Sequence, residues 1–312
     1  MKEYEIAIIG GGGAGLTAAI YAARAQRTTA VFERAVTGGQ IATTSLVENF
    51  PGFPDGVNGF ELAQHMERQA VKFGAELITE DVTALKHEPD GSFLLTTTVG
   101  PYRAKAVIMT AGADYNKIGV PGESEFVGRG VSYCATCDAA FFKGDAVVVI
   151  GGGDAALDEG EFVTRYADSV TIVHRRDTLR AGALLQERAF ANPKIQFKLD
   201  TVVERIEGGE HVERVVLRNV KTGEHSTFAT SGVFIFIGQT PNSGLLAGLV
   251  ETDPGGHAMV DLQMRTTVPG LFVAGDLRTQ SARQLIAAAG DGATAAIAAE
   301  HWLASGGQGM AK

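Results

Sequence analysis

The two cysteines of the chain, Cys134 and Cys137, are separated by two residues and followed directly by Asp138. Two thiols at this spacing can close into a small disulfide ring and return to the dithiol without a large backbone motion. Their thiolate pKa is typically about 7, against about 8.5 for a free cysteine. A zinc site needs about four ligands, and the sequence offers no second cysteine pair or histidine cluster to complete one. The motif therefore predicts redox chemistry, in preference to a metal half-site or two unrelated core cysteines.

A glycine-rich loop near the start of the chain has the form of a dinucleotide-binding fingerprint. The apolar run 5–9 predicts a buried parallel strand, and it leads into Gly10, Gly12 and Gly15, which fill the pattern G-x-G-x-x-G. The segment 16–23 then predicts a helix. In such a loop the glycines make a tight turn and let the backbone approach a pyrophosphate, which faces the positive end of the helix. The context favours nucleotide binding over a plain glycine-rich turn.

A second copy of this unit lies near the middle of the chain. The apolar run 145–150 predicts a strand, and 157–166 predicts a helix. Between them Gly151, Gly153 and Ala156 match the related pattern G-x-G-x-x-A. The chain therefore holds two nucleotide-binding fingerprints, and two bound nucleotides are expected.

The residues that follow each fingerprint distinguish the two nucleotides. Glu33 ends the strand after the first loop, where an acid accepts hydrogen bonds from an adenosine ribose. His174 stands at the same offset after the second loop, followed by Arg175 and Arg176, with Arg180 one turn further on. Guanidinium groups at this place suit a 2′-phosphate. The first loop is thus expected to hold FAD or NAD and the second NADPH, although an exposed charge run is the simpler alternative for the basic residues.

The remaining hydrophobic pattern predicts an α/β protein. Alternating or continuous apolar runs indicate further strands, at 29–32, 76–85, 92–98, 106–112, 204–220, 228–238 and 269–276. Helical spacing indicates helices at 60–73 and 284–302. Glycine- and proline-containing turns at 112–121 and 238–242 are candidate linkers.

Length and charge limit the classes of function. A chain of 312 residues is expected to form about two domains. The net charge of −9 argues against a general nucleic-acid surface. The first residues lack the pattern of a signal peptide, and no apolar run reaches the roughly 20 residues of a membrane span. Because the cysteines form a single pair and no disulfide framework, a reducing compartment is expected, most simply the cytoplasm.

In order and spacing, these motifs resemble the low-molecular-weight thioredoxin reductases along nearly the whole chain. The resemblance rests on the following segments: 10–15, 38–40, 48–52, 134–138, 151–156, 174–176 with Arg180, 275–276 and 283–284. It implies two Rossmann-like domains, each with the three-layer ββα architecture. The NADPH domain would be inserted into a discontinuous FAD domain. FAD would bind to 1–113 and 243–312, and NADPH to 114–242. A homodimer is also implied.

The resemblance assigns roles around the cysteines. Cys137 would be the sulfur next to the flavin, Cys134 would attack the disulfide of thioredoxin, and Asp138 would be the acid that serves the thiol chemistry. Phe141 and Phe142 match an exposed aromatic contact for thioredoxin, with a core role for one of them as the alternative. Ala139 departs from the family, in which many members have glycine after the acid.

Cofactor binding is implied for residues in and around both fingerprints, and no metal is implied. These residues are Gly10, Gly12, Ala14, Gly15, Glu33, Gly39, Gln40, Asn49, Val82, Ala111, Gly112, Gly151, Gly153, Asp154, Ala155, His174, Arg175, Arg176, Arg180, Gly275, Asp276, Arg283, Gln284 and Leu285. Asp154 and Ala155 depart from the family, where Asn with Ser or Thr is commoner, and Asp154 adds negative charge near a pyrophosphate.

The implied mechanism is a relay from nicotinamide to flavin, then to the Cys134–Cys137 disulfide, and finally to thioredoxin by thiol–disulfide exchange. Both the cysteines and the nicotinamide need access to the flavin, and the family resolves this by rotating one domain on two linkers. Three alternatives remain open. They are a flavin-dependent dithiol oxidase, a ferredoxin-linked flavoenzyme, and a nucleotide-binding redox sensor without turnover. The basic cluster at 174–176 argues against the first two. A peroxiredoxin reductase would carry an additional N-terminal CxxC domain, which this sequence lacks.

Overall fold

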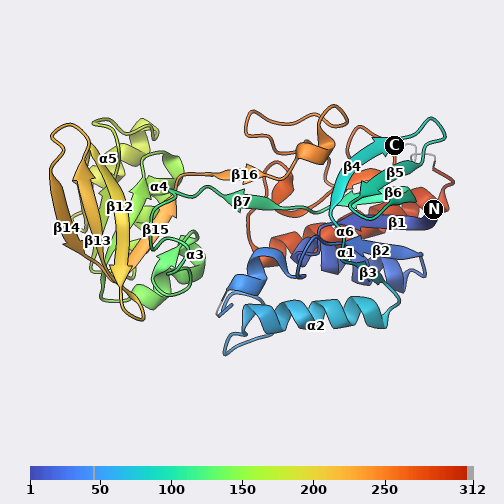
Figure 1. Ribbon diagram of the computed structural model, residues 1–312, viewed down its shortest axis with the longest axis horizontal. Coiled ribbons are helices and arrows are strands. Elements are labelled where there is room, and N and C mark those ends of the chain that lie inside the picture. Colours follow the sequence, from blue (N-terminus) through green and yellow to red (C-terminus); the bar gives the residue numbers. More distant parts are fainter. Residues whose placement is uncertain (45, 308–312) are drawn as a thin grey trace. The chain divides into compact units, whose positions relative to one another are not determined.

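The computed structural model describes residues 1–44 and 46–307, which fold into two compact units (Figure 1). We call Met1–Asp114 with Thr240–Lys312 the terminal unit, and Tyr115–Gln239 the inserted unit. The chain passes from one to the other through β7 (Ala113–Tyr115) and β16 (Gln239–Pro241), which pair with each other. Both predicted linkers therefore contain a short strand.

The terminal unit is built on a mixed sheet of order β3-β2-β1-β6-β5-β4, with β17 also paired to β6. Its strands are β1 (Lys2–Ile9), β2 (Thr29–Phe32), β3 (Glu76–Ile78), β4 (Val82–His87), β5 (Phe93–Thr97), β6 (Pro101–Met109) and β17 (Leu271–Val273). The central strands are parallel, and Ile8 of β1 lies between Val31 and Ile108. Because both faces of these strands are covered, they read as continuous apolar runs in the sequence.

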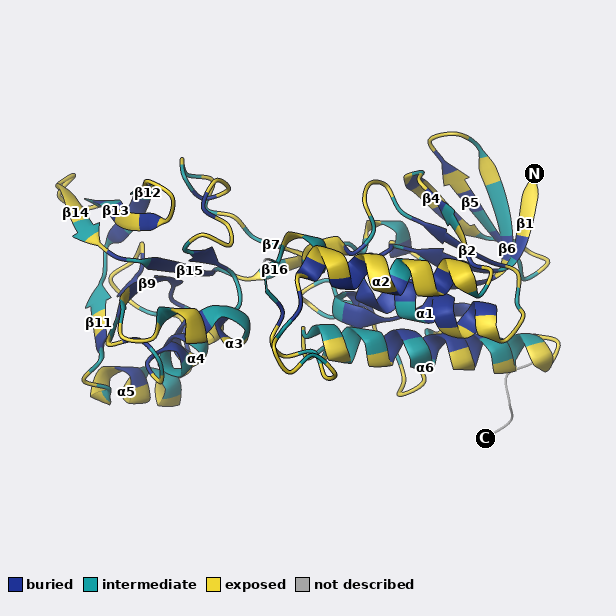
Figure 2. Cartoon of the chain, turned by 90° about the horizontal axis from the view of Figure 1, so that it is seen from below, coloured by how far each residue is buried: buried dark blue, intermediate teal, exposed yellow. Residues whose placement is uncertain are grey.

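Three helices accompany this sheet in the described part of the terminal unit: α1 (Gly13–Arg24), α2 (Gly59–Lys72) and α6 (Leu285–Ala304). Helix α1 lies between the other two (Figure 2). Alanines form much of the packing between α1 and α6. At Gly292 the approach is so close that an added Cβ would lie 2.1 Å from the carbonyl oxygen of Ala14. The first turn of α1, which follows the first glycine loop, is thus held against α6.

Gly292→Ala is expected to destabilise the protein by about 1–3 kcal/mol, because the methyl group forces α6 away from α1. Gly290→Ala is the matched control, since Gly290 lies on the same helix, is exposed, and has no atom within 4 Å of the added Cβ. This second change should stabilise by about 0.5–1 kcal/mol through helix propensity. Urea-induced unfolding of both variants measures the difference. If both variants changed the free energy of unfolding equally and in the same direction, the packing argument would be contradicted.

The inserted unit has three layers (Figure 2). Its central parallel sheet has the order β11-β10-β9-β15-β8, formed by β8 (Val131–Ser132), β9 (Ala146–Gly151), β10 (Ser169–Val173), β11 (Ile195–Lys198) and β15 (Gly232–Phe236). One face packs on α4 (Asp154–Val163) and its neighbours α3 (Ala135–Asp138) and α5 (Ala183–Ala191). The other face packs on an antiparallel sheet of β12 (Thr201–Gly208), β13 (Val212–Asn219) and β14 (His225–Ala229). The predicted α/β class with two Rossmann-like units is confirmed.

Three predicted strands are wrong as continuous elements. The run 228–238 covers the end of β14 and all of β15, which lie in different sheets. The run 204–220 is a hairpin, because the chain turns between β12 and β13 after Gly208 and Gly209. The run 76–85 is interrupted between β3 and β4, which lie at opposite ends of the sheet order. In all three cases a short connection interrupts the strand, although the apolar pattern of the sequence continues on either side.

Candidate active site

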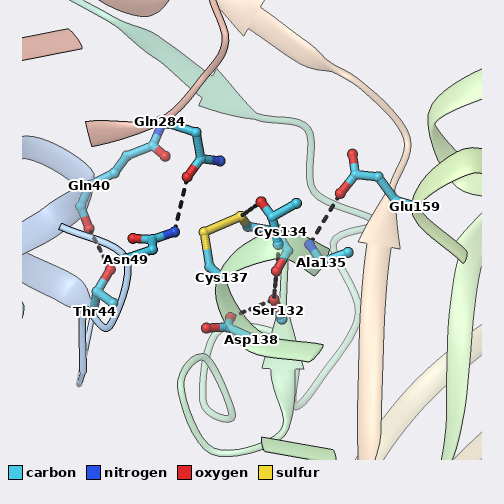
Figure 3. Close-up of a disulfide and its surroundings, with 11 residues drawn as sticks. Gln40, Thr44, Asn49, Ser132, Cys134, Ala135, Cys137, Asp138, Glu159 and Gln284 are labelled. Atoms are coloured by element: carbon cyan, nitrogen blue, oxygen red, sulfur yellow. Dashed lines mark hydrogen bonds between the residues drawn. A yellow bond between two sulfur atoms is a disulfide. The ribbon is translucent and has the colours of Figure 1, made fainter. Parts of the chain in front are cut away.

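The cysteine pair lies at the carboxyl end of β8 in the inserted unit. Cys134 is the N-cap of the short helix α3, and Cys137 lies within that helix. The two residues form a disulfide, with their Cα atoms 5.4 Å apart (Figure 3). Both side chains are half-buried, and the hydroxyl Oγ1 of Thr136 lies 3.4 Å from Sγ of Cys134. The predicted redox pair is therefore present, in its oxidised form, on the surface of this unit.

Asp138 is held by the residue that ends β8. The hydroxyl of Ser132 donates to Oδ2 of Asp138 at 2.6 Å, and Oγ of Ser132 accepts the backbone N–H of Cys134 at 3.1 Å. Burial raises the pKa of Asp138 above its ordinary value, and the hydrogen bond from Ser132 opposes this rise. A carboxyl with a raised pKa is better suited to hold and deliver a proton in thiol chemistry than an ordinary aspartate.

A second carboxylate fixes the backbone at the start of α3. The N–H of Ala135 donates to Oε2 of Glu159, on α4, at 3.1 Å (Figure 3). The aromatic residues behind the motif have different environments. Phe141 is 48 % exposed, whereas Phe142 packs edge-on against Phe234. Of these two aromatic residues, Phe141 is the exposed one within this unit, and Phe142 has the core role that was the alternative for one of the pair.

The first glycine loop has the geometry of a nucleotide cradle. A Cβ on Gly10 would lie 2.5 Å from the carbonyl oxygen of Thr110, and one on Gly15 would lie 1.9 Å from the carbonyl oxygen of Gly10. Gly12, the N-cap of α1, has no atom within 4 Å of the same position. Two glycines are therefore needed for close packing, and the third leaves the loop open beside the helix N-terminus. Glu33 reaches the same loop, where its Oε2 accepts the N–H of Gly11 at 2.8 Å.

Other predicted cofactor residues of the terminal unit gather near this loop. Gly39 opens the 3₁₀ helix η1 (Gly39–Thr43), and its added Cβ would lie 3.4 Å from Cα of Gly12. The side chain of Leu285 would lie 2.4 Å from a Cβ added to Gly13 of this loop. The side chain of Ala14, in the same loop, would lie 3.1 Å from a Cβ added to Gly275. Gln40 donates to the carbonyl of Ala113.

The rest of the predicted set is distributed over neighbouring loops. Ala111 and Gly112 follow β6, and both their carbonyl groups accept hydrogen bonds from Asn242. Asn49 donates to Gln284 at 3.1 Å (Figure 3), next to Arg283 with its φ of +54°.

Val82 lies in the sheet of the terminal unit. It is the first residue of β4, is 6 % exposed and packs in the apolar cluster of the sheet.

Asp276 lies in the 3₁₀ turn η4 (Gly275–Leu277) and accepts a hydrogen bond from Ser281 at 2.9 Å. Burial raises its pKa. A buried ion pair fixes this turn, because Arg278 donates to both oxygens of Asp291 at 2.7 and 2.9 Å. Asp291, on α6, also accepts the N–H of Gly275 at 3.1 Å. The sequence analysis did not identify this pair, which ties Asp276 to the helix that packs on the first glycine loop.

In the second glycine loop, Gly153 has no atom within 4 Å of an added Cβ, whereas one on Gly152 would lie 2.3 Å from the ring of His174. His174 is 6 % exposed, and burial lowers its pKa. It therefore packs beneath the loop in its neutral form. Asp154 accepts the N–H of Gly182 at 2.7 Å, and the N–H of Arg180 donates to the carbonyl of Gly152.

These two hydrogen bonds hold segment 175–182, which carries the arginines, against the second glycine loop. Arg175, Arg176 and Arg180 are exposed there, while Gly151 ends β9 and Ala155 follows Asp154 in α4. The second fingerprint and its basic residues are thus brought together within the inserted unit.

Among residues 1–44 and 46–307, none of the helices has the length and apolarity that a membrane crossing requires.

Comparisons with known proteins show the relatives of this chain. The family model described as pyridine nucleotide-disulphide oxidoreductase matches residues 4–293. A thioredoxin reductase of Treponema pallidum is 48% identical over 301 residues, which cover 96% of this chain and 97% of the relative. One of Streptomyces coelicolor is 50% identical over 303 residues, which cover 96% and 94%. The crystal structure of thioredoxin reductase from Streptococcus pyogenes superposes with a TM-score of 0.93 at 44% identity, covering 97% of this chain and 99% of that chain.

Proposed function

Since this chain belongs to the thioredoxin reductases of the pyridine nucleotide-disulphide oxidoreductase family, we propose that it reduces the disulfide of a thioredoxin through Cys134 and Cys137, with FAD and NADPH as its cofactors. One observation carries the proposal. A CxxC disulfide is followed directly by a half-buried carboxyl whose pKa is raised, in a unit that also has a nucleotide loop flanked by arginines. When bound, FAD and NADPH supply the electrons that return the disulfide to the dithiol.

FAD belongs to the terminal unit in this proposal. The open backbone at Gly12 and the N-terminus of α1 suit a pyrophosphate. Glu33 lies at the loop and suits a ribose hydroxyl. The turn with Asp276 is held on α6 by Arg278 and Asp291 and offers a carboxyl to the same nucleotide.

NADPH belongs to the inserted unit. The open face at Gly153 and the N-terminus of α4 suit its pyrophosphate, and the exposed guanidinium groups of Arg175, Arg176 and Arg180 suit its 2′-phosphate. Asp154 departs from the family pattern, but its carboxylate is engaged by the N–H of Gly182. That bond supports a role in shaping the basic segment.

The thiol chemistry follows from the cysteine pair. The thiolate of Cys134 attacks one sulfur of the thioredoxin disulfide, so a mixed disulfide forms and the partner's own S–S bond breaks. The thiolate of Cys137 then attacks Sγ of Cys134, restores the intramolecular disulfide and releases the second partner sulfur. Both released sulfurs take up a proton, and two electrons pass to the partner. Asp138 holds or delivers a proton beside these sulfurs.

We also propose that the active protein is a homodimer.

The purified protein is expected to be yellow, with one FAD per chain, and to reduce thioredoxin with NADPH. Glu33→Ala should raise the Kd of FAD roughly 10- to 100-fold, because a charge-assisted hydrogen bond is lost. Fluorescence titration of the apoprotein with FAD measures this, and Glu3→Ala, an exposed carboxylate on β1, is the control. A folded protein that cannot take up FAD, or that leaves thioredoxin oxidised, would refute the proposal.

A further inference from the structure

Ser132 makes the closest polar contact with Asp138 and also touches the cysteine backbone. It is the last residue of β8, is 5 % exposed, and is fixed by the pairing of β8 with β15, in which it lies opposite Phe234. Its hydroxyl lies 2.6 Å from Oδ2 of Asp138, 3.1 Å from the backbone nitrogen of Cys134 and 3.2 Å from the carbonyl oxygen of Cys134 (Figure 3). The two contacts with Cys134 are those of an ordinary serine turn, and the contact with Asp138 adds a side chain to it.

The three contacts satisfy the hydroxyl in two different states of Asp138. A serine hydroxyl has one hydrogen to donate and two lone pairs to accept. When Asp138 is a carboxylate, Ser132 donates to it and accepts the N–H of Cys134. When Asp138 is protonated, its O–H can donate to Ser132, whose own hydrogen can turn to the carbonyl of Cys134. The hydroxyl of Ser132, Oδ2 of Asp138 and the N–H of Cys134 each keep a partner in both states.

We propose that Ser132 is a positioning residue for thiol–disulfide exchange, which holds the side chain of Asp138 in one place beside the cysteine pair whether or not it carries a proton. This rests on the proposed function of the cysteine pair and extends it. Buried polar groups left without a partner cost free energy. A fixed partner for both protonation states therefore lets the proton leave and return without rearrangement of the site.

Few other titratable groups lie close enough to influence the protonation of Asp138. Helix α3 packs on α4 and on the 3₁₀ helix η2 (Ala139–Phe142), and β8 pairs with β15. Neither η2 nor β15 has a titratable residue. From α4, Glu159 faces the segment through its bond to the N–H of Ala135. Because burial raises the pKa of Asp138 while Ser132 lowers it, removing the hydroxyl should move the titration of Asp138 to higher pH.

The test follows exchange between the pre-reduced holoprotein and an oxidised partner by stopped flow, from pH 5 to pH 9. Glutathione disulfide and oxidised thioredoxin are used in separate series. Ser132→Ala should slow exchange about tenfold. The pH dependence of the rate should have a midpoint that is absent in Asp138→Asn, and in Ser132→Ala this midpoint should lie about one pH unit higher than in wild type. Ser132→Thr, which keeps the hydroxyl, should stay within about threefold of wild type. Ser231→Ala is the matched control, since it removes a similar bond to Asp145 elsewhere in the same unit, and it should change neither quantity.

Coupling between the two residues provides the decisive comparison. In an Asp138→Asn background, Ser132→Ala should slow exchange by no more than about twofold, because neighbours that act together are not additive. An unchanged pH midpoint in Ser132→Ala, or a full tenfold loss in the Asp138→Asn background, would overturn the proposal. Ser132→Gly gives the same comparison if the alanine variant does not fold. If wild type exchanges with glutathione disulfide but not with thioredoxin, the proposed function fails while the role of Ser132 is still measured.

Discussion

Cys134→Ser and Cys137→Ser are both expected to lower NADPH-dependent reduction of thioredoxin by at least about a thousandfold, because a two-electron disulfide exchange needs both sulfurs. The two variants should nevertheless differ in what they trap. With Cys134 as the attacking thiol, Cys137→Ser forms a stable mixed disulfide with a thioredoxin that lacks its own resolving cysteine. Cys134→Ser should form little or none.

Non-reducing electrophoresis and intact mass measure this adduct directly. The variants are each other's control, because each retains one thiol of the same motif and the chain has no other cysteine. NADPH should still bleach the bound flavin in both, which shows that the cofactor sites are intact. The structure leaves both sulfurs half-buried, so exposure alone does not decide between them. The hydroxyl of Thr136 beside Sγ of Cys134 favours that sulfur as the thiolate. An adduct formed by Cys134→Ser and absent from Cys137→Ser would reverse the two roles.

The parts of the fold that depend on local sequence could be predicted. Each glycine fingerprint is a strand, a loop and a helix within about 30 residues, and both appear in the predicted order. Helices α1 and α4 begin at Gly13 and Asp154, three residues before the predicted starts at 16 and 157. The strands of the central sheets read clearly because they are buried on both faces. The insertion of one unit into the other is a long-range property. It came from the resemblance, since no local pattern states which distant strands share a sheet.

The parts of the site that the sequence did not reveal depend on contacts between distant elements. Arg278 and Asp291 meet only because a turn and a helix pack together, and Glu159 reaches Ala135 only because α4 lies beside α3. Ser132 stands two residues before the cysteine pair, and this proximity was the one available signal. His174 illustrates the opposite problem. In sequence it begins a basic run, yet it is buried beneath Gly152 in its neutral form. Burial of this kind is set by packing, which a charge pattern does not report.

Selectivity for NADPH should therefore reside in the exposed arginines. Arg175→Ala combined with Arg176→Ala is expected to raise the KM for NADPH roughly 10- to 100-fold and the KM for NADH less than about threefold. The reason is that hydrogen bonds between guanidinium groups and a phosphate are charge-assisted, and NADH has no 2′-phosphate to lose them. Steady-state kinetics with both nucleotides and one thioredoxin measures the ratio. Because these arginines are exposed, added salt should also weaken NADPH binding more than NADH binding.

The matched control is Arg165→Ala combined with Arg188→Ala, which removes two exposed arginines from the same unit away from the second glycine loop. It lowers the positive charge by the same amount, so a general electrostatic effect would appear in both double variants. Only the first should change the ratio of the two KM values. If wild type already prefers NADH, the 2′-phosphate assignment is wrong. Asp154 would then be the first residue to replace, because its carboxylate both adds charge at the N-terminus of α4 and ties Gly182, and with it the arginine segment, to the loop. Asp154→Asn separates these effects, since an amide oxygen can still accept the N–H of Gly182 while the charge is gone.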